Sequence, residues 1–247
     1  MKRVQLEAVG WAFGGVVFLA LAGALAVQGR MAPLPSSGWL AASAYILISN
    51  VMLVRGLQRR RYTRFGPANI VTTTRSTLVG LITGLVVASF TTGISVVLLV
   101  ALVAPALALD AIDGWVARRT GTTSELGARF DMEVDAFLLL AMSVYVAQSL
   151  GVWVLGIGAM RYAFVAVGWA VPWFRRPLPP RYWRKVVTAV AGIALAVAAS
   201  GLLSWGGAVL VGTALAMLVE SFGRDVIWLA HRRTTEQHEL VYAKPAS

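Results

Sequence analysis

Four aspartates near the middle of the chain have spacings that follow the helical repeat. Asp110 and Asp113 are three residues apart, so they share one face of a helix. Asp131 and Asp135 are four residues apart and share one face of the next helix. A turn between the two helices would bring the carboxylates together, and like charges repel one another unless cations hold them. Hard divalent cations that prefer oxygen ligands, Mg²⁺ or Mn²⁺, are therefore expected at this cluster.

Small residues flank the aspartates and leave room beside them for a bulky group. Ala117 is four residues beyond Asp113, and Gly127 is four residues before Asp131, so both lie on the aspartate faces. Gly114 directly follows Asp113. Solvation of the helix ends, or salt bridges with nearby arginines, would explain one or two acids. Neither explains four acids in register on two helices.

The same window resembles the signature of the CDP-alcohol phosphotransferase family, D-x2-D-G-x2-A-R-x8-G-x3-D-x3-D. All eight fixed positions are matched at the spacing of the family. The resemblance implies that the substrate is a CDP-linked lipid, usually CDP-diacylglycerol, from which CMP leaves as an alcohol attacks. It also implies a set of metal ligands, namely Asp110, Asp113, Asp131 and Asp135.

Further roles follow from the resemblance. Two metal ions held by the aspartates would clamp a pyrophosphate, and Asp135 is also the candidate base for the attacking hydroxyl. The residues of the window expected to bind the CDP group are Asp113, Gly114, Ala117, Arg118 and Gly127. The small residues admit the cytidine, and Arg118 contacts the pyrophosphate.

A second, looser resemblance lies upstream. Family members often carry P-N-x-x-T-x-x-R at the entry of the first core helix, and the stretch from Pro67 to Arg75 matches it with one inserted residue. This match implies nucleotide contacts for Asn69 and Thr72. Both residues are equally suited to capping a helix at an interface.

The composition is that of a helical membrane protein. The chain has 247 residues, of which 58% are hydrophobic and 13% charged, with a net charge of +11. A soluble domain of this size carries far more charge. In a membrane protein, lysine and arginine mark the cytoplasmic loops, so we expect membrane lipids and not nucleic acid as partners. The lack of cysteine excludes thiolate metal sites.

Apolar runs predict an all-α, polytopic fold with eight membrane spans. The expected spans are residues 8–27, 39–54, 69–90, 94–109, 125–150, 153–174, 186–203 and 206–230. The fourth helix should continue past the membrane surface through residue 118, and residues 175–185 should form an extended loop. The resemblance places a six-helix catalytic core at 67–230. Residues 1–66 then hold two extra N-terminal transmembrane helices and a basic linker, and residues 231–247 form a polar, mobile cytoplasmic tail.

The basic residues also predict the orientation in the membrane. All but Arg30 and Arg161 of the 22 lysines and arginines fall at the expected cytoplasmic ends and loops. This asymmetry places the aspartate window at the cytoplasmic surface of the cell (inner) membrane. A homodimer is implied by analogy with the family alone.

Basic residues beyond the window are candidates for binding the acceptor alcohol. Arg161 lies deep in the sixth span, where it either forms an ion pair with Glu220 or lines a cavity that receives the acceptor. Arg181, Arg184 and Lys185 lie at the entry of the seventh span. As a group they favour an anionic acceptor, although the orientation rule alone would also place them there.

The expected protein is a phospholipid-synthesising transferase that moves a phosphatidyl group from CDP-diacylglycerol to an alcohol. A phosphorylated polyol, inositol phosphate or glycerol phosphate, is the favoured acceptor, with serine or a lipid alcohol as the alternative. A transporter or structural membrane protein that retains the motif is the alternative of a different class. Glu220, Arg224 and Asp225, near the end of the last span, are expected to form a network between helices.

Overall fold

A computed structural model describes residues 34–60, 67–120, 125–175, 178–179, 181–203 and 205–242. In these ranges the chain forms α-helices and two short 3₁₀ helices, without any strand, as the all-α prediction requires. The α-helices are α2 (Ser36–Arg60), α3 (Pro67–Ala88), α4 (Val96–Thr120), α5 (Glu125–Leu150), α6 (Leu155–Ala170), α7 (Tyr182–Ser200) and α8 (Gly206–Tyr242). The 3₁₀ helices are η1 (Val152–Val154) and η2 (Pro172–Arg175).

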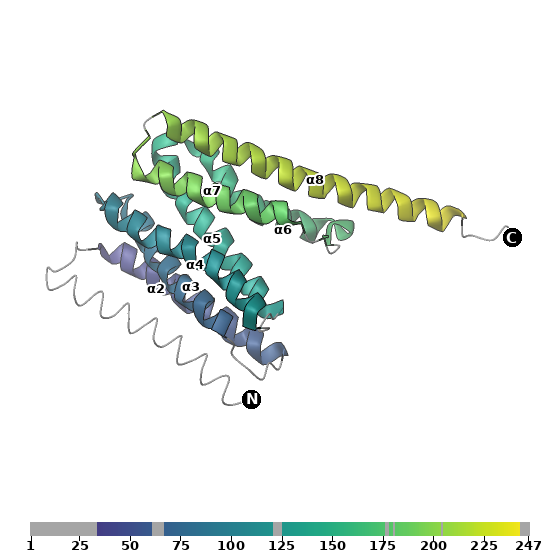
Figure 1. Cartoon of the computed structure of the whole chain (residues 1–247), viewed down its shortest axis with the longest axis horizontal. Helices are drawn as coiled ribbons and strands as arrows, with labels where there is room; N and C mark the ends of the chain where they lie inside the picture. Colours follow the sequence, from purple (N-terminus) through teal and green to yellow (C-terminus); the bar gives the residue numbers. More distant parts are fainter. Residues whose placement is uncertain are drawn as a thin grey trace.

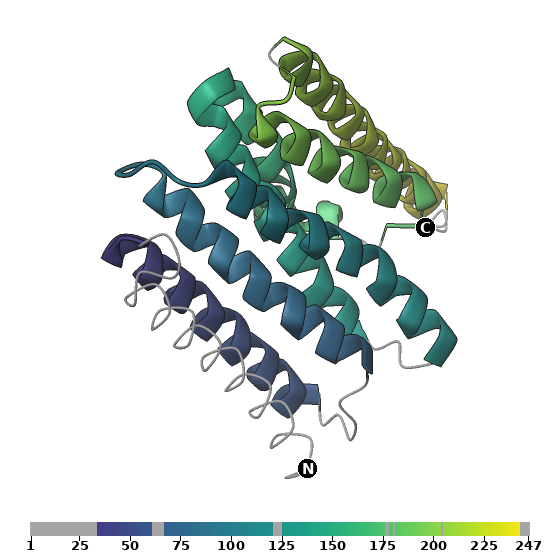
Figure 2. The ribbon, with the colours of Figure 1, turned by 60° about the vertical axis from the view of Figure 1, so that its left-hand side comes forward.

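The helices form two groups that meet where α5 packs against α6 and α7 and where α4 packs against α7. In Figure 1, α2 to α5 run obliquely beside one another, while α6, α7 and α8 lie above them and run closer to the horizontal. Figure 2 shows α2, α3 and α4 as neighbouring helices. Helix α5 packs against α3 on one side and against α6 and α7 on the other. Buried apolar residues such as Ile82 of α3, Val134 of α5 and Leu195 of α7 form the common core.

The helices are those of a polytopic membrane protein. Five described stretches are long and apolar enough to cross a bilayer. They are Ser36–Gly56, Val71–Ala88, Val152–Ala170, Tyr182–Ser200 and Gly206–Arg233. The apolar part of α4 is shorter, Val96–Asp110. Helix α5 is outside this set, so its crossing of the membrane stays a prediction, and the expected first span, residues 8–27, lies outside the described residues.

Helices α2 and α3 approach closely because glycines lie between them. A Cβ atom added at Gly80 would lie 2.6 Å from Cγ1 of Ile46, and one at Gly84 would lie 2.7 Å from the carbonyl oxygen of Gly38. Small residues let two membrane helices pack backbone to backbone. The Ser76 hydroxyl of α3 also donates a hydrogen bond to the Ser49 hydroxyl of α2, at 3.1 Å. The second N-terminal helix is therefore tightly joined to α3.

Three expected helix boundaries were wrong. The sixth helix does not run unbroken from 153 to 174, because α6 ends at Ala170 and Val171 is extended, with φ −120° and ψ 104°. Pro172 follows, and proline disfavours the helical conformation of the residue before it. Helix α7 begins at Tyr182, four residues early, and ends at Ser200. Gly201, which follows it, is in the left-handed conformation (φ 68°), which favours glycine.

The third correction concerns the C-terminal tail. Helix α8 does not stop at residue 230 but continues to Tyr242. Residues 231–242, expected to be a mobile polar tail, are thus helical. In contrast, α4 continues through residue 118 to Thr120, and α5 spans 125–150, both as predicted.

Candidate active site

Helices α4 and α5 bring three of the four predicted aspartates together. Asp110, Asp131 and Asp135 each offer one carboxylate oxygen to a group in which these oxygens all lie within 4.8 Å of one another. Their side chains are 40%, 31% and 25% exposed, so the cluster lies partly at the protein surface. Asp113 lies on α4 one turn beyond Asp110, and its side chain is outside the described part of the structure.

An arginine from α3 completes the cluster. Arg75 has no exposed surface, and its Nη1 atom lies 2.6 Å from Oδ1 of Asp110. Its Nη2 atom lies 2.8 Å from Oδ1 of Asp135 and also pairs with Oδ1 of Asp131. The same Nη2 donates a hydrogen bond to the backbone carbonyl of Asp131, at 3.3 Å. One guanidinium therefore links α3, α4 and α5 at the site.

Sequence reasoning had given Arg75 no role, although it ends the upstream motif. The signal was present, because an ionised side chain inside an apolar helix requires a partner. Thr72, one turn earlier on α3, is 4% exposed. Asn69 lies in the first turn of α3, which opens at Pro67, the position where proline fits a helix best. The side chain of Asn69 is outside the described residues.

The residues present fit a divalent cation. All three donors are carboxylate oxygens, the ligand type that Mg²⁺ and Mn²⁺ prefer. When all groups are ionised, three carboxylates and one guanidinium leave two negative charges uncompensated. A cation on the exposed side of the cluster would offset this charge.

The residues predicted to bind CDP lie on the same two helices. Gly127 is half-buried on α5, one turn before Asp131. Gly114, Ala117 and Arg118 lie on the last turns of α4. The backbone of all three residues is helical, and the side chains of Ala117 and Arg118 are outside the described part of the structure.

Of the two alternatives for Arg161, the ion pair with Glu220 was wrong. Nη2 of Arg161, on α6, pairs with Oε1 of Glu133 on α5. Helices α5 and α6 pack directly against each other, which brings Glu133 within reach. Glu220 instead pairs with Arg224 one turn along α8 and accepts a hydrogen bond from Nε1 of Trp183, at 3.1 Å.

The other acceptor candidates lie at the start of α7, and two of them, Arg181 and Arg184, contact α8. Nη1 of Arg184 is 3.3 Å from Oδ2 of Asp225, and Nη1 of Arg181 is 3.7 Å from its Oδ1. Asp225 is 2% exposed. Lys185 follows Arg184 in the first turn of α7. The expected network between helices is thus confirmed for Asp225.

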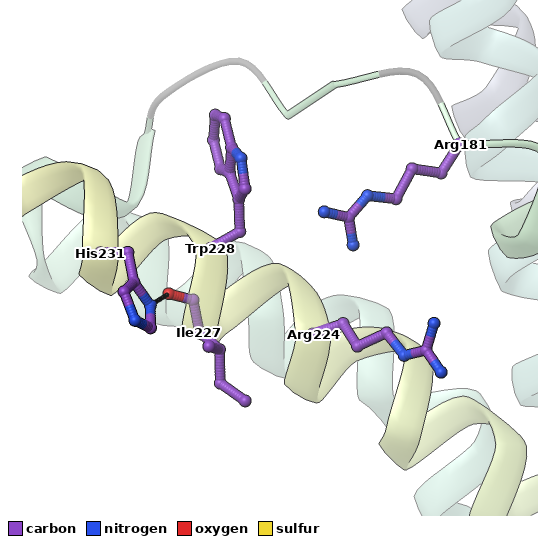
Figure 3. Close-up of a pocket in the computed structure, with 5 residues that line it drawn as sticks. All are labelled: Arg181, Arg224, Ile227, Trp228 and His231. Carbon is purple, nitrogen blue, oxygen red and sulfur yellow. Dashed lines mark hydrogen bonds between the residues drawn. The ribbon is translucent and has the colours of Figure 1, made fainter.

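An open groove of about 500 Å³ lies beside this network. Its lining residues, drawn in Figure 3, are Arg181, Arg224, Ile227, Trp228 and His231. The guanidinium of Arg181 points across the groove toward α8 (Figure 3). His231 shares a hydrogen bond of 2.9 Å, through Nδ1, with the carbonyl oxygen of Ile227. Arginine and aromatic side chains thus line the groove beside the start of α7.

The helical membrane fold and its carboxylate cluster define a polytopic membrane protein with a candidate cation site on α4 and α5. The sequence model of the CDP-alcohol phosphatidyltransferase family matches residues 65–220, and the chain belongs to this family. The matched region runs from the start of α3 into α8 and contains all four aspartates and Arg75. The protein is therefore a transferase that uses a CDP-alcohol and an alcohol acceptor. Comparisons with curated proteins and with solved structures found no significant match.

Proposed function

We propose that the protein transfers a phosphatidyl group from CDP-diacylglycerol to an alcohol, with release of CMP. The observation that carries this proposal is the convergence of Asp110, Asp131 and Asp135, within 4.8 Å, in a chain that belongs to the family. In the reaction, the acceptor oxygen forms a bond to the phosphatidyl phosphorus. The bond from that phosphorus to the bridging oxygen breaks, and CMP leaves with the electron pair.

The aspartates have two roles in this proposal. Asp110, Asp113, Asp131 and Asp135 would hold two Mg²⁺ or Mn²⁺ ions. Bound there, the ions would supply positive charge that neutralises the pyrophosphate and the leaving CMP. Asp135 orients the acceptor hydroxyl and takes its proton.

The nucleotide side of the site is formed by α3, α4 and the start of α5. Thr72 lies about one helical turn before Arg75 on α3, so both residues are on the same side of that helix. The residues proposed to bind CDP are Asn69, Thr72, Asp113, Gly114, Ala117, Arg118 and Gly127. The small members of this set leave space for the cytidine, and Arg118 contacts the pyrophosphate.

The proposed acceptor is a phosphorylated polyol such as inositol phosphate or glycerol phosphate. Cations outnumber acids among the acceptor candidates and the charged residues at the contacts of α5 with α6 and of α7 with α8. The cations are Arg161, Arg181, Arg184, Lys185 and Arg224, and the acids are Glu133, Glu220 and Asp225. This surplus of positive charge suits an acceptor that carries a phosphate.

A neutral acceptor, serine or a lipid alcohol, has one observation in its favour. Arg161 is already paired with Glu133, and Arg184 with Asp225. If these pairs persist during turnover, less positive charge is available for an acceptor phosphate. A phosphorylated acceptor therefore predicts that changes to these arginines alter the acceptor kinetics, whereas a neutral acceptor predicts unchanged acceptor kinetics.

The location and assembly of the protein complete the proposal. The bias of lysine and arginine supports a site at the cytoplasmic face of the cell (inner) membrane. Family analogy supports a homodimer. A transporter that keeps the motif would bind CDP-lipid without releasing CMP.

The test is CMP release by the purified full chain in detergent. Radiolabelled CDP-diacylglycerol is supplied with Mg²⁺, Mn²⁺ or EDTA, and with inositol phosphate, glycerol phosphate, serine or a lipid alcohol in turn. We expect CMP release with a divalent cation and a phosphorylated polyol, and none with EDTA. Release with serine alone would replace the acceptor class, and no release with any acceptor would contradict the transferase proposal.

A further inference from the structure

We propose that Arg75 is a positioning residue that holds the carboxylates of Asp110, Asp131 and Asp135 from the interior and so preorganises the cation site. The inference rests on the proposed function only in that the aspartates bind a divalent cation. It assigns to α3, which supplies none of the predicted metal ligands, a direct part in forming the metal site.

The first argument is the order of burial across the cluster. Arg75 is 0% exposed, whereas the three aspartates it contacts are between 25% and 40% exposed. The guanidinium therefore lies on the protein side of the carboxylates. A cation that enters from solvent reaches the carboxylates from the opposite side.

The second argument is that the two sets of contacts are compatible. Arg75 contacts Oδ1 of each aspartate, and every carboxylate has two oxygens. A carboxylate can therefore keep its contact with the guanidinium while it binds a cation. Partners of this kind fix the orientation of metal ligands and raise the affinity for the metal.

The third argument is the shape of the guanidinium. A planar fork with several N–H donors can bind three carboxylates from two helices at once. A lysine ammonium on the same helix would be a point charge without this fixed geometry. The Nε atom of Arg75 is buried and has no hydrogen-bond partner among the described residues, so the side chain is placed for its Nη contacts.

A competing account is that Arg75 occupies the cation site and must be displaced by the metal. The two accounts predict opposite changes. If Arg75 positions the ligands, its removal weakens metal binding. If it competes for the same oxygens, its removal strengthens metal binding.

The experiment measures Mn²⁺ binding to the purified full chain in detergent, without substrate, from the electron paramagnetic resonance signal of free Mn²⁺. The variants are Arg75→Lys and Arg75→Met. The control is Arg224→Met, which removes an arginine paired with a single acid on α8. Helicity by circular dichroism and a single gel-filtration peak establish that each variant is folded.

We expect the Kd for Mn²⁺ to rise about 10- to 100-fold in both Arg75 variants, the range found when groups that orient metal ligands are removed. The control should bind as the unchanged protein does. Unchanged or tighter Mn²⁺ binding in either folded Arg75 variant overturns the inference. Failure of both variants to fold also contradicts it, because a positioning role leaves the helix bundle intact.

The result is separable from the fate of the proposed function. If the unchanged protein binds Mn²⁺ and Arg75 variants bind it weakly, but no acceptor gives CMP release, the transferase proposal fails and the role of Arg75 stands. If CMP release is found and the Arg75 variants bind Mn²⁺ normally, the transferase proposal stands and the role of Arg75 fails.

Discussion

Nη1 of Arg75 lies 2.6 Å from Oδ1 of Asp110, although 35 residues separate them in the chain. This contact joins the two stretches of sequence that resemble the family, the upstream motif on α3 and the aspartate window on α4 and α5. The two motifs are therefore parts of one site. Their common function can be examined by changing one residue of the site at a time.

The first prediction concerns the ligand charge. Asp113→Asn or Asp131→Asn should lower CMP release at saturating Mg²⁺ by at least about 100-fold, because each change removes a charge that binds the cation. The fold should persist, since neither change alters side-chain size. Glu220→Gln, the same change in a carboxylate of α8, is the control and should leave turnover within a few-fold. Substantial activity in either aspartate variant would contradict the two-ion assignment.

The second prediction concerns orientation in the membrane. The chain has no cysteine, so single cysteines can be labelled specifically. A cysteine at Gly93, where an added Cβ meets nothing within 4 Å, should react with an impermeant thiol reagent added outside intact cells. A cysteine at Gly121, the residue after the last residue of α4 in the sequence, should react only after the membrane is opened. The opposite pattern would place the aspartates on the outer surface.

The third prediction concerns the acceptor. Arg161→Lys keeps the charge but loses the planar fork that binds a phosphate through two hydrogen bonds. With a phosphorylated polyol, we expect its KM to rise about tenfold or more, while the KM for CDP-diacylglycerol changes little.

A matched variant separates this role from that of the ion pair. Glu133→Gln removes the partner of Arg161 and leaves the guanidinium in place. If Arg161 serves only the pair, both variants should lower the melting temperature with unchanged acceptor kinetics. That outcome would favour serine or a lipid alcohol over a phosphorylated acceptor.

The fourth prediction concerns the contact of α2 with α3. Gly80→Ala would place a methyl group 2.6 Å from Cγ1 of Ile46, and the resulting overpacking should destabilise the protein by about 1–3 kcal/mol. Gly212→Ala on α8 is the control, since its Cβ would meet nothing within 4 Å. Thermal unfolding in detergent measures both. Equal melting temperatures for the two variants would show that α2 is not closely packed on α3.

Features that depend on one helix alone were predictable. The helical repeat of about 3.6 residues places Asp131 and Asp135 on one face, whichever helices pack against it. Helix α5 also spans the residues that were expected for it. The continuation of α4 to Thr120 followed from the position of its acids. Family resemblance then supplied the substrate class, which spacing could not supply.

Features that depend on how helices meet were not predictable. The partner of Arg161 could be sought only among acids at a matching depth, and depth alone does not tell which helix lies next to α6. Glu133, on α5, is the partner because α5 packs against α6. Arg75 was missed for the same reason, because its partners lie on two other helices. The early end of α6 had a local cause in Pro172 and could have been predicted.

The hydrogen bond from Ser76 to Ser49 has a consequence for shortened forms of the protein. The region matched by the family begins at residue 65, so a chain cut there would retain Arg75 and every aspartate but lose α2. Lipid would then meet a bare serine hydroxyl and the glycine-lined side of α3, one residue away from the buried guanidinium. We expect such a chain to insert into membranes yet bind Mn²⁺ poorly. An active protein would then need α2, although α2 lies outside the region that the family shares.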